Sequence, residues 1–158
     1  MRGIILIISI LLCLSFDLKT NTIKSVFVVK LNYHIKWSKT IGKRFVIAVT
    51  GNKEIYNRIK EFLPERFKGR EASVLFINNL KVIEEIPEID VVYIGKESRI
   101  KFTKPNIVTF SDYESNQPIF LFYFERNKLK FDVNLKHAKS QGIAVNSRVL
   151  TLANKIYR

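Results

Sequence analysis

The sequence predicts an α/β fold: a three-layer α/β/α sandwich with a mostly parallel sheet, a C-terminal antiparallel hairpin and two short terminal helices. Three observations lead to this prediction. Apolar runs alternate with helical patterns between residues 44 and 110. Two strand-like runs then follow each other with only two residues between them. The C-terminal segment contains two patterns that are typical of capped helices.

The chain has room for one domain. Its 158 residues are 47% hydrophobic, which is enough for an apolar core. No linker, internal repeat or low-complexity tract interrupts residues 23 to 158. We therefore expect a signal peptide over residues 1–20 and a single α/β domain over residues 21–158.

The N-terminal segment resembles a secretory signal. Arg2 precedes an apolar run from Ile4 to Leu14, which is shorter than the roughly 20 residues that cross a bilayer. A lipoprotein acylated at Cys13 is an alternative, although Leu12 stands where a lipobox has a small residue. An uncleaved anchor is a third interpretation. The signal peptide remains the leading one.

Residues 23 to 37 fit two structures. Phe27 and Leu31 belong to a helical stripe, whereas the β-branched Val28 and Val29 suit a strand. Periodicity leaves both open.

The next segment predicts a strand-helix-strand unit. Residues 44–50 are apolar and end at Gly51, after which Asn52 can cap a helix. The inward face of that helix consists of Ile55, Ile59, Phe62 and Leu63.

Further apolar strands follow at residues 73–77, 89–94 and 106–110, with a short helical face over residues 80–86 and a helical turn over residues 97–103. Near-continuous apolar strands separated by helices indicate a parallel sheet that is covered on both faces.

Residues 119–125 and 128–134 predict a hairpin, because only Arg126 and Asn127 separate them and Asn tolerates the positive φ of a tight turn. Glu125 and Lys128 then face each other as opposite charges.

The C-terminal segment predicts two helices. Asn134 can cap the first, and Gly142 supplies the left-handed residue that ends it. The second begins at Asn146 or Ser147, and its inward face consists of Val149, Leu152, Ala153 and Ile156.

The order and spacing of FDVNLKHAKSQGIAVNSRVLTLA, residues 131–153, resembles the C-terminal signature of the YfiR/HmsC-like family of small secreted bacterial proteins. The structural motif residues that match are Phe131, Asp132, Val133, Asn134, Leu135, Ala138, Gly142, Ser147, Val149, Leu150, Leu152 and Ala153. A weaker match is LNYHIKW, where the family has Trp-Pro and this chain has Trp37 followed by Ser38.

The resemblance implies a periplasmic, non-enzymatic regulator. Well-understood members bind the periplasmic sensing domain of an inner-membrane diguanylate cyclase and hold it inactive, so we expect a partner of that kind or a histidine kinase periplasmic domain. A second copy of the chain is a further partner.

The resemblance also favours a helix over residues 23–36. Cys13 is the only cysteine, which removes the disulfide switch of some members. Asn116-Gln117-Pro118 stands where members often have a Gly-rich turn.

Three aromatic residues are candidates for a partner surface, since Trp and Tyr are frequent in binding hot spots. They are Tyr33 and Trp37, expected on the first helix, and Tyr123 in the hairpin. Core packing is the alternative for all three.

A small-molecule-binding sensor module is the competing function. Gly51 and Asn52 follow a strand and open a helix, a geometry that offers backbone N–H groups to an anion. Asp132 and Asn134 share one strand face and could orient a ligand, although capping and support of the hairpin explain them as well.

The sequence offers no catalytic or metal motif. His34 and His137 lack the spacing of a zinc site, and His137 is expected to be a solvated helix residue. No Gly-x-Ser-x-Gly elbow occurs, so we expect no enzyme and no cofactor.

The net charge of +13 favours an acidic partner or an anionic membrane, or only solvates the fold. Nucleic acid is not expected, because a secreted protein meets little of it.

Overall fold

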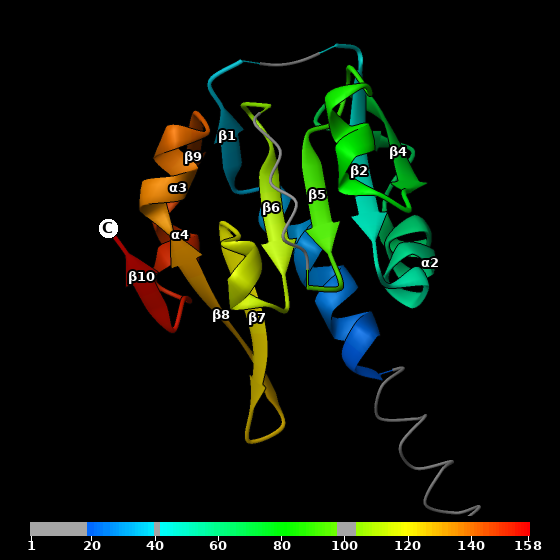
Figure 1. Ribbon diagram of the computed structural model, residues 1–158. Coiled ribbons are helices and arrows are strands. Elements are labelled where there is room, and N and C mark those ends of the chain that lie inside the picture. Colours follow the sequence, from blue (N-terminus) through cyan, green and yellow to red (C-terminus); the bar gives the residue numbers. More distant parts are fainter. Residues whose placement is uncertain (1–18, 40–41, 98–103) are drawn as a thin grey trace, which may run out of the picture.

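The structure is a computed structural model that describes residues 19–39, 42–97 and 104–158 (Figure 1). The predicted signal peptide therefore falls almost entirely outside the described residues, as does the helical turn predicted over residues 97–103.

An eight-stranded sheet organises the described part of the chain. From one edge to the other its strands are β10 (Lys155–Tyr157), β8 (Lys128–Asn134), β7 (Phe120–Glu125), β6 (Val108–Ser111), β5 (Val91–Ile94), β2 (Arg44–Thr50), β4 (Arg70–Phe76) and β3 (Arg66–Phe67). Neighbouring strands from β4 to β7 are parallel, and β7 pairs with β8 antiparallel. Figure 1 shows β10 and β4 at opposite sides of the molecule. The predicted α/β fold is confirmed.

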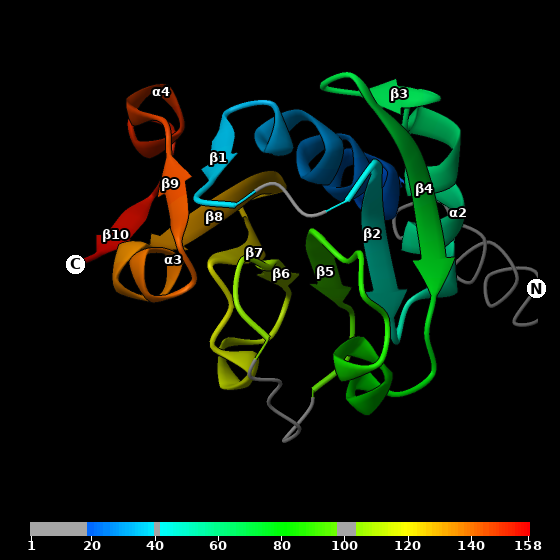
Figure 2. The ribbon, with the colours of Figure 1, turned by 90° about the horizontal axis from the view of Figure 1, so that it is seen from above.

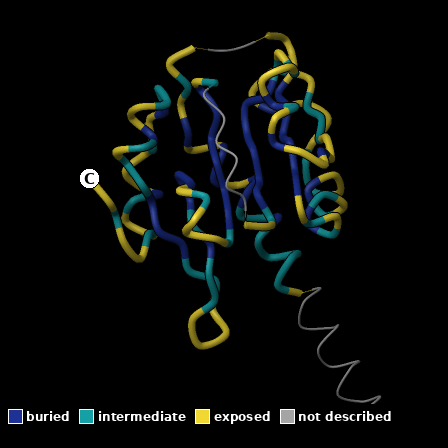
Figure 3. The backbone as a smooth tube through the Cα atoms, in the orientation of Figure 1, coloured by how far each residue is buried: buried dark blue, intermediate teal, exposed yellow. Residues whose placement is uncertain are grey.

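Two apolar clusters fill the space on the two faces of the sheet. The larger contains residues of a helix of residues 19–32 and of α2 (Lys53–Phe62), and Figure 2 shows α2 beside β4. The smaller lies under the 3₁₀ helix η1 (Leu80–Glu84), where Leu80 and Ile83 are buried. Figure 3 shows the central strands as the buried part of the chain. In the described residues, the third layer is thus one 3₁₀ turn.

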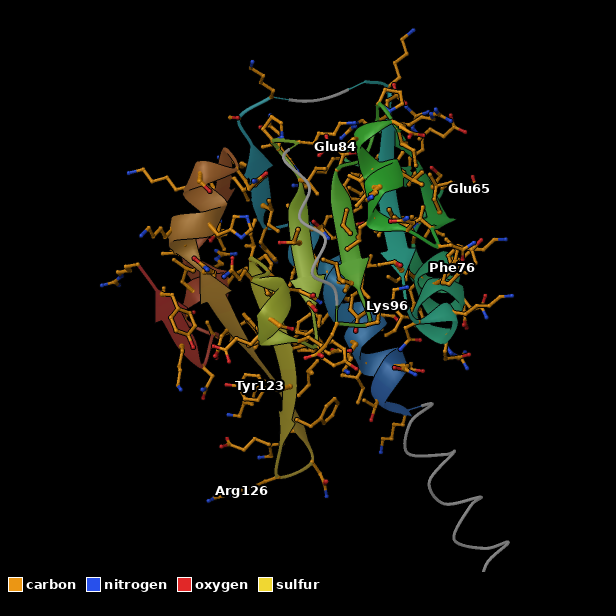
Figure 4. All side chains as sticks on the ribbon, viewed as in Figure 1. Glu65, Phe76, Glu84, Lys96, Tyr123 and Arg126 are labelled. Carbon is orange, nitrogen blue, oxygen red and sulfur yellow. The ribbon has the colours of Figure 1, made fainter. Side chains whose placement is uncertain are left out.

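The cap and the turn predicted from local sequence are present in the structure. The side chain of Asn52 accepts a hydrogen bond from the backbone N–H of Ile55 at 3.0 Å, as predicted for the start of α2. Arg126 and Asn127 have φ of 49° and 59°, the left-handed values that a two-residue hairpin turn requires. This turn lies at the exposed tip of the β7–β8 hairpin, which is labelled at Arg126 in Figure 4.

The segment of residues 23–37 combines both structures that its sequence allowed. The helix ends at Asn32, and β1 (Ile35–Trp37) follows after a turn. Trp37 therefore lies on a strand and Tyr33 in the turn, so the expectation that the first helix carries both is wrong. The cause is long-range, because β1 pairs antiparallel with β9 (Ile143–Val145) near the other end of the chain.

The last predicted helix is wrong beyond its first turn. The helix α3 (Leu135–Ser140) forms as expected, but α4 (Ser147–Leu150) is a single turn and Leu152 is 71% exposed. The chain then enters β10, which pairs parallel with β8. Pairing with β8 satisfies backbone groups that a longer helix would have satisfied internally.

The segment around Gly69 contains a tight turn. Lys68 and Gly69 have φ of 50° and 81°, and they join β3 to β4 in an antiparallel pair. β4 consequently begins at Arg70 and ends at Phe76, earlier at both ends than the predicted strand of residues 73–77.

Candidate functional site

The C-terminal motif closes the fold by placing Gly142 against two distant segments. The N–H of Ser38 donates to the backbone oxygen of Gly142 at 2.8 Å, and the N–H of Asn106 donates to that of Gln141 at 2.9 Å. Gly142 has φ of 70°, and a Cβ there would lie 2.4 Å from Oγ of Ser38 and 2.9 Å from Oδ1 of Asn106. Both the backbone conformation and the close approach therefore require glycine.

Most of the other motif residues also hold the fold together. Asn134 accepts a hydrogen bond from the N–H of His137 at 2.9 Å and so caps α3, while Ser147 begins α4. The residues of the motif that lie in or against the larger apolar cluster are Phe131, Val133, Leu135, Ala138, Val149, Leu150 and Ala153. Leu152 is the exception, since it points to solvent.

Asp132 joins the hairpin to the last strand. It is 5% exposed, and its Oδ1 accepts hydrogen bonds from the hydroxyl of Tyr123 at 2.8 Å and from the N–H of Lys155 at 3.1 Å. The hydroxyl of Tyr157 lies 3.4 Å from Oδ2. Burial and the bond to the carboxylate raise the pKa of Tyr123 to about 12. Tyr123, a predicted partner residue, is thus held by the fold through its hydroxyl.

An open pocket of about 600 Å³ lies beside this carboxylate. It is bounded by α3, β7, β8, β10 and the 3₁₀ helix η2 (Glu114–Asn116). Its lining combines the acidic Glu114 and Asp132, the basic Lys136 and His137, and the aromatic ring of Tyr157. A pocket with both charges and an aromatic wall can orient a small polar molecule by hydrogen bonds and ring contact.

Sequence reasoning missed this pocket. His137 is half-buried, and its Nδ1 lies 2.8 Å from the backbone oxygen of Gln117 at the pocket lining, so this residue is not merely solvated. Gln117 has φ of 48°. The one sequence feature that could have pointed to this pocket is the Asn116-Gln117-Pro118 turn, which stands where a Gly-rich turn is common. Its position beside α3 depends on the tertiary fold and could not be predicted from the sequence. Asp132 and Asn134, considered as ligand residues from the sequence, both line the pocket.

Tyr33 and Trp37 meet in an aromatic and cationic cluster at the end of the sheet where β2 and β4 begin. We call Tyr33, Trp37, Phe45, Phe67 and Lys68 the Trp37 cluster. The rings of Tyr33 and Phe67 are 4.3 Å apart, those of Phe45 and Phe67 4.2 Å, and those of Trp37 and Phe45 5.9 Å. Tyr33 remains 48% exposed. Tyr123 is not part of this cluster.

Lys68 places a cation on the cluster. Its Nζ lies 5.1 Å from the centre of the Trp37 ring and donates to the backbone oxygen of Ile35 at 2.6 Å. Burial lowers the pKa of the Lys68 ammonium, and the nearby charge of Lys36 lowers it further. A neighbouring anion would relieve both effects.

A buried ion pair between Arg70 and Asp90 lies next to the Trp37 cluster. Arg70 donates to both carboxylate oxygens of Asp90, at 2.7 and 3.1 Å, and the N–H of Val46 donates to Oδ2 at 3.0 Å. Burial raises the pKa of the Asp90 carboxyl, and the hydrogen bonds from Arg70 and Val46 offset part of that rise. The Trp37 indole N–H lies 3.4 Å from the backbone oxygen of Asp90. The position of Trp37 is thus coupled to this pair.

Gly51 and Asn52, the predicted ligand residues, are occupied by contacts within the chain. A Cβ on Gly51 would lie 2.6 Å from Cγ of Lys96, so this lysine packs over the glycine. The side chain of Asn52 caps α2 and also lies 3.4 Å from Oδ1 of Asn21. Their role in binding a ligand stays a prediction.

Among the described residues, no group of three or more His, Cys, Asp or Glu side chains is placed to hold a metal ion. No helix in the same residues combines the length and the apolar character that a bilayer crossing needs.

The comparisons with known proteins bear on the C-terminal motif directly. No curated protein matches the sequence. The model of one family, described as YfiR/HmsC-like, matches residues 21–154. This range contains both β1 and β9, the Trp37 cluster and the whole C-terminal motif, so the resemblance noted above is confirmed. The chain belongs to the YfiR/HmsC-like family.

Proposed function

We propose that the protein is a periplasmic regulator that binds the outer domain of a membrane-bound diguanylate cyclase, or of a similar signalling protein such as a histidine kinase, and represses it. The observation that carries this proposal is the family match over residues 21–154. The family indicates a periplasmic regulatory role in cyclic di-GMP signalling, and a regulatory role requires no catalysis.

The Trp37 cluster is the proposed docking surface. It combines a half-exposed tyrosine, a tryptophan and an exposed lysine whose ammonium group lies over the tryptophan ring. Tryptophan and tyrosine are among the residues that contribute most to binding energy in protein interfaces. Exposed basic residues neighbour its members in the sequence, namely Lys36, Lys39, Lys43, Arg44 and Arg66. The surface therefore suits an acidic face of a sensor domain.

The mechanism is a population shift. A sensor domain that exchanges between an active and an inactive conformer moves toward the one that the regulator binds more tightly. Repression then requires only that the Trp37 cluster contacts the inactive conformer better than the active one.

The test compares repression in cells with binding in solution. The full chain is co-expressed with a candidate cyclase, cyclic di-GMP is measured, and binding of the purified outer domain is measured by calorimetry. Tyr33→Ala and Lys68→Glu should each weaken binding and raise cyclic di-GMP. Leu152→Ala removes an exposed apolar side chain elsewhere and serves as the control. Full repression by a folded Tyr33→Ala, Lys68→Glu double variant would rule out this surface.

A small-molecule sensor is the second candidate, and the pocket beside Asp132 favours it. On this proposal the ligand binds between η2 and α3 and not at Gly51 and Asn52. A thermal-shift screen of nucleotides and aromatic metabolites should find a compound that raises the melting temperature. His137→Ala should abolish that shift, while Lys53→Ala, a change outside the pocket, should leave it unchanged. A screen without any stabilising compound would favour the regulator that acts through protein contacts alone.

A further inference from the structure

The C-terminal part of the chain carries more than half of its net positive charge. Residues 126–158 contain eight lysines and arginines but a single acidic residue, so their side chains contribute +7 of the net +13. The acidic residue is Asp132, which is 5% exposed and accepts hydrogen bonds from Tyr123 and Lys155. This part of the chain therefore exposes many cations and no acidic side chain of its own.

Five of these cations lie on one side of the molecule. Lys136 and Lys139 belong to α3, Arg148 belongs to α4, and Lys155 and Arg158 belong to β10 and the residue that follows it. Figures 1 and 2 show α3, α4 and β10 together in both views, on the side that carries the C-terminus. All five side chains are exposed, and we call them the C-terminal basic surface.

The charges of this surface are not paired within the protein. None of the ion pairs found among the described residues includes one of its five side chains. Glu114 is exposed and lines the same pocket as Lys136, but these two residues form no ion pair. Like charges on neighbouring elements repel one another, and an anionic partner relieves that repulsion. The surface therefore suits a partner with many negative charges.

Two exposed apolar side chains lie on the same part of the chain. Leu152, just after α4, is 71% exposed, and Tyr157 in β10 is 45% exposed. A membrane interface accepts all three kinds of group, because leucine enters the acyl boundary, tyrosine lies at the headgroups and lysine and arginine contact lipid phosphates. Nucleic acid would use mainly the charges, since its phosphates dominate the affinity of such contacts. The combination favours a bilayer.

We propose that the C-terminal basic surface binds the anionic headgroups of a phospholipid bilayer, with Leu152 inserted at the boundary between headgroups and acyl chains. No residue of the Trp37 cluster takes part, so this contact uses a different part of the molecule from the proposed sensor contact. Adsorption to the bilayer raises the local concentration of the protein beside any membrane-bound partner.

Flotation of the purified protein with vesicles tests the proposal. The vesicles contain either phosphatidylcholine alone or an equal mixture of phosphatidylcholine and phosphatidylglycerol. We expect binding to depend on phosphatidylglycerol and to weaken as salt rises. The protein is purified in the form to which cells process it, and any contribution from residues 4–14 is the same in every variant.

Two variants with the same net charge separate this surface from the charge of the whole chain. The surface variant changes four of its cations, none of which lines the pocket, namely Lys139→Gln, Arg148→Gln, Lys155→Gln and Arg158→Gln. It should bind the mixed vesicles at least about a hundredfold more weakly. The control variant changes four exposed lysines elsewhere, namely Lys30→Gln, Lys53→Gln, Lys60→Gln and Lys81→Gln. It should lose less than about threefold in affinity, because salt screens distant charges.

A further pair of variants tests the inserted leucine. Leu152→Gln keeps every charge and should still weaken binding at least about fivefold, because a leucine side chain gains free energy when it leaves water. Leu75→Gln changes another exposed leucine and should bind as the unmodified protein does. Circular dichroism checks that each variant is folded.

No dependence on phosphatidylglycerol, or equal binding by the surface and control variants, would overturn the proposal. Binding to heparin or a DNA duplex that the surface variant loses, without binding to vesicles, would also overturn it and assign the surface to a soluble polyanion. Full binding by Leu152→Gln would exclude the insertion. The calorimetric test of sensor binding contains no membrane, so its outcome, including that of the Leu152→Ala control, is independent of these results.

Discussion

The hydroxyl of Tyr123 donates a hydrogen bond to Oδ1 of Asp132 at 2.8 Å, and this bond joins the two strands of the hairpin on the face that leads to the pocket. The pKa of Tyr123 is raised from 10.0 to about 12, with burial as the largest cause and the carboxylate as the next. The folded protein thus holds this proton more tightly than the unfolded chain does.

The first prediction concerns alkaline pH. Because the unfolded state loses the Tyr123 proton first, the contribution of Tyr123 to stability is present below pH 10 and is lost as pH rises to about 12. An ultraviolet titration of the tyrosines should contain a late component that becomes smaller in Tyr123→Phe, and the part that remains belongs to Tyr93, whose pKa burial also raises. In Asp132→Asn the same component should move to lower pH. A late component unchanged in Tyr123→Phe would contradict this.

The second prediction concerns the tie between the hairpin and β10. Asp132→Ala leaves the N–H of Lys155 and the hydroxyl of Tyr123 without their acceptor, and should lower the free energy of unfolding by about 2 kcal/mol. Tyr157→Phe removes only a contact of 3.4 Å and should cost less than about 0.5 kcal/mol. Urea unfolding measures both. Equal costs would mean that Asp132 is not the centre of this network.

The third prediction compares two glycines with similar backbone conformations. Gly142 and Gly69 have φ of 70° and 81°, but a Cβ on Gly69 meets nothing within 4 Å. Gly69→Ala should therefore cost only the left-handed conformation, about 1 kcal/mol. Gly142→Ala adds the clash with Ser38 and Asn106 and should cost clearly more. The difference in the free energy of unfolding between the two variants, measured with urea, gives the cost of the steric clash at Gly142.

The fourth prediction compares two arginine pairs. Arg70→Met leaves the buried Asp90 without its ion pair and should destabilise the fold by about 3 kcal/mol. Arg44→Met breaks a pair with Glu88 in which the arginine side chain is 57% exposed, and should cost under about 1 kcal/mol. The fluorescence of Trp37, the only tryptophan, should change in the folded state of Arg70→Met, because its indole contacts Asp90. An unchanged fluorescence spectrum would mean that the position of Trp37 does not depend on the Arg70–Asp90 pair.

Elements with a complete local signal were predictable from the sequence. α2 carries its own cap at Asn52 and its own inward stripe, and the hairpin carries a turn at Arg126 and Asn127 that admits only a few conformations. For these elements, local preference and tertiary structure agree.

Elements that depend on distant partners were not predictable from the sequence. Ile35–Trp37 looks helical by spacing but pairs with β9, and Ile156 completes a helical stripe but lies in β10 beside β8. Periodicity describes which side chains are apolar and not which backbone groups find partners. The site followed the same rule. Tyr33 and Trp37 were predictable as aromatic candidates, but their contact with Phe67 and Lys68 depends on the turn at Gly69.

The pairing of β1 with β9 also affects the order in which the chain can fold. Residues 35–37 find their partners only at residues 143–145, so a ribosome must make nearly the whole polypeptide before the first strand can be satisfied. The β1–β9 sheet can accordingly form only after residue 145 has been made, and until then the backbone groups of residues 35–37 must be satisfied by water.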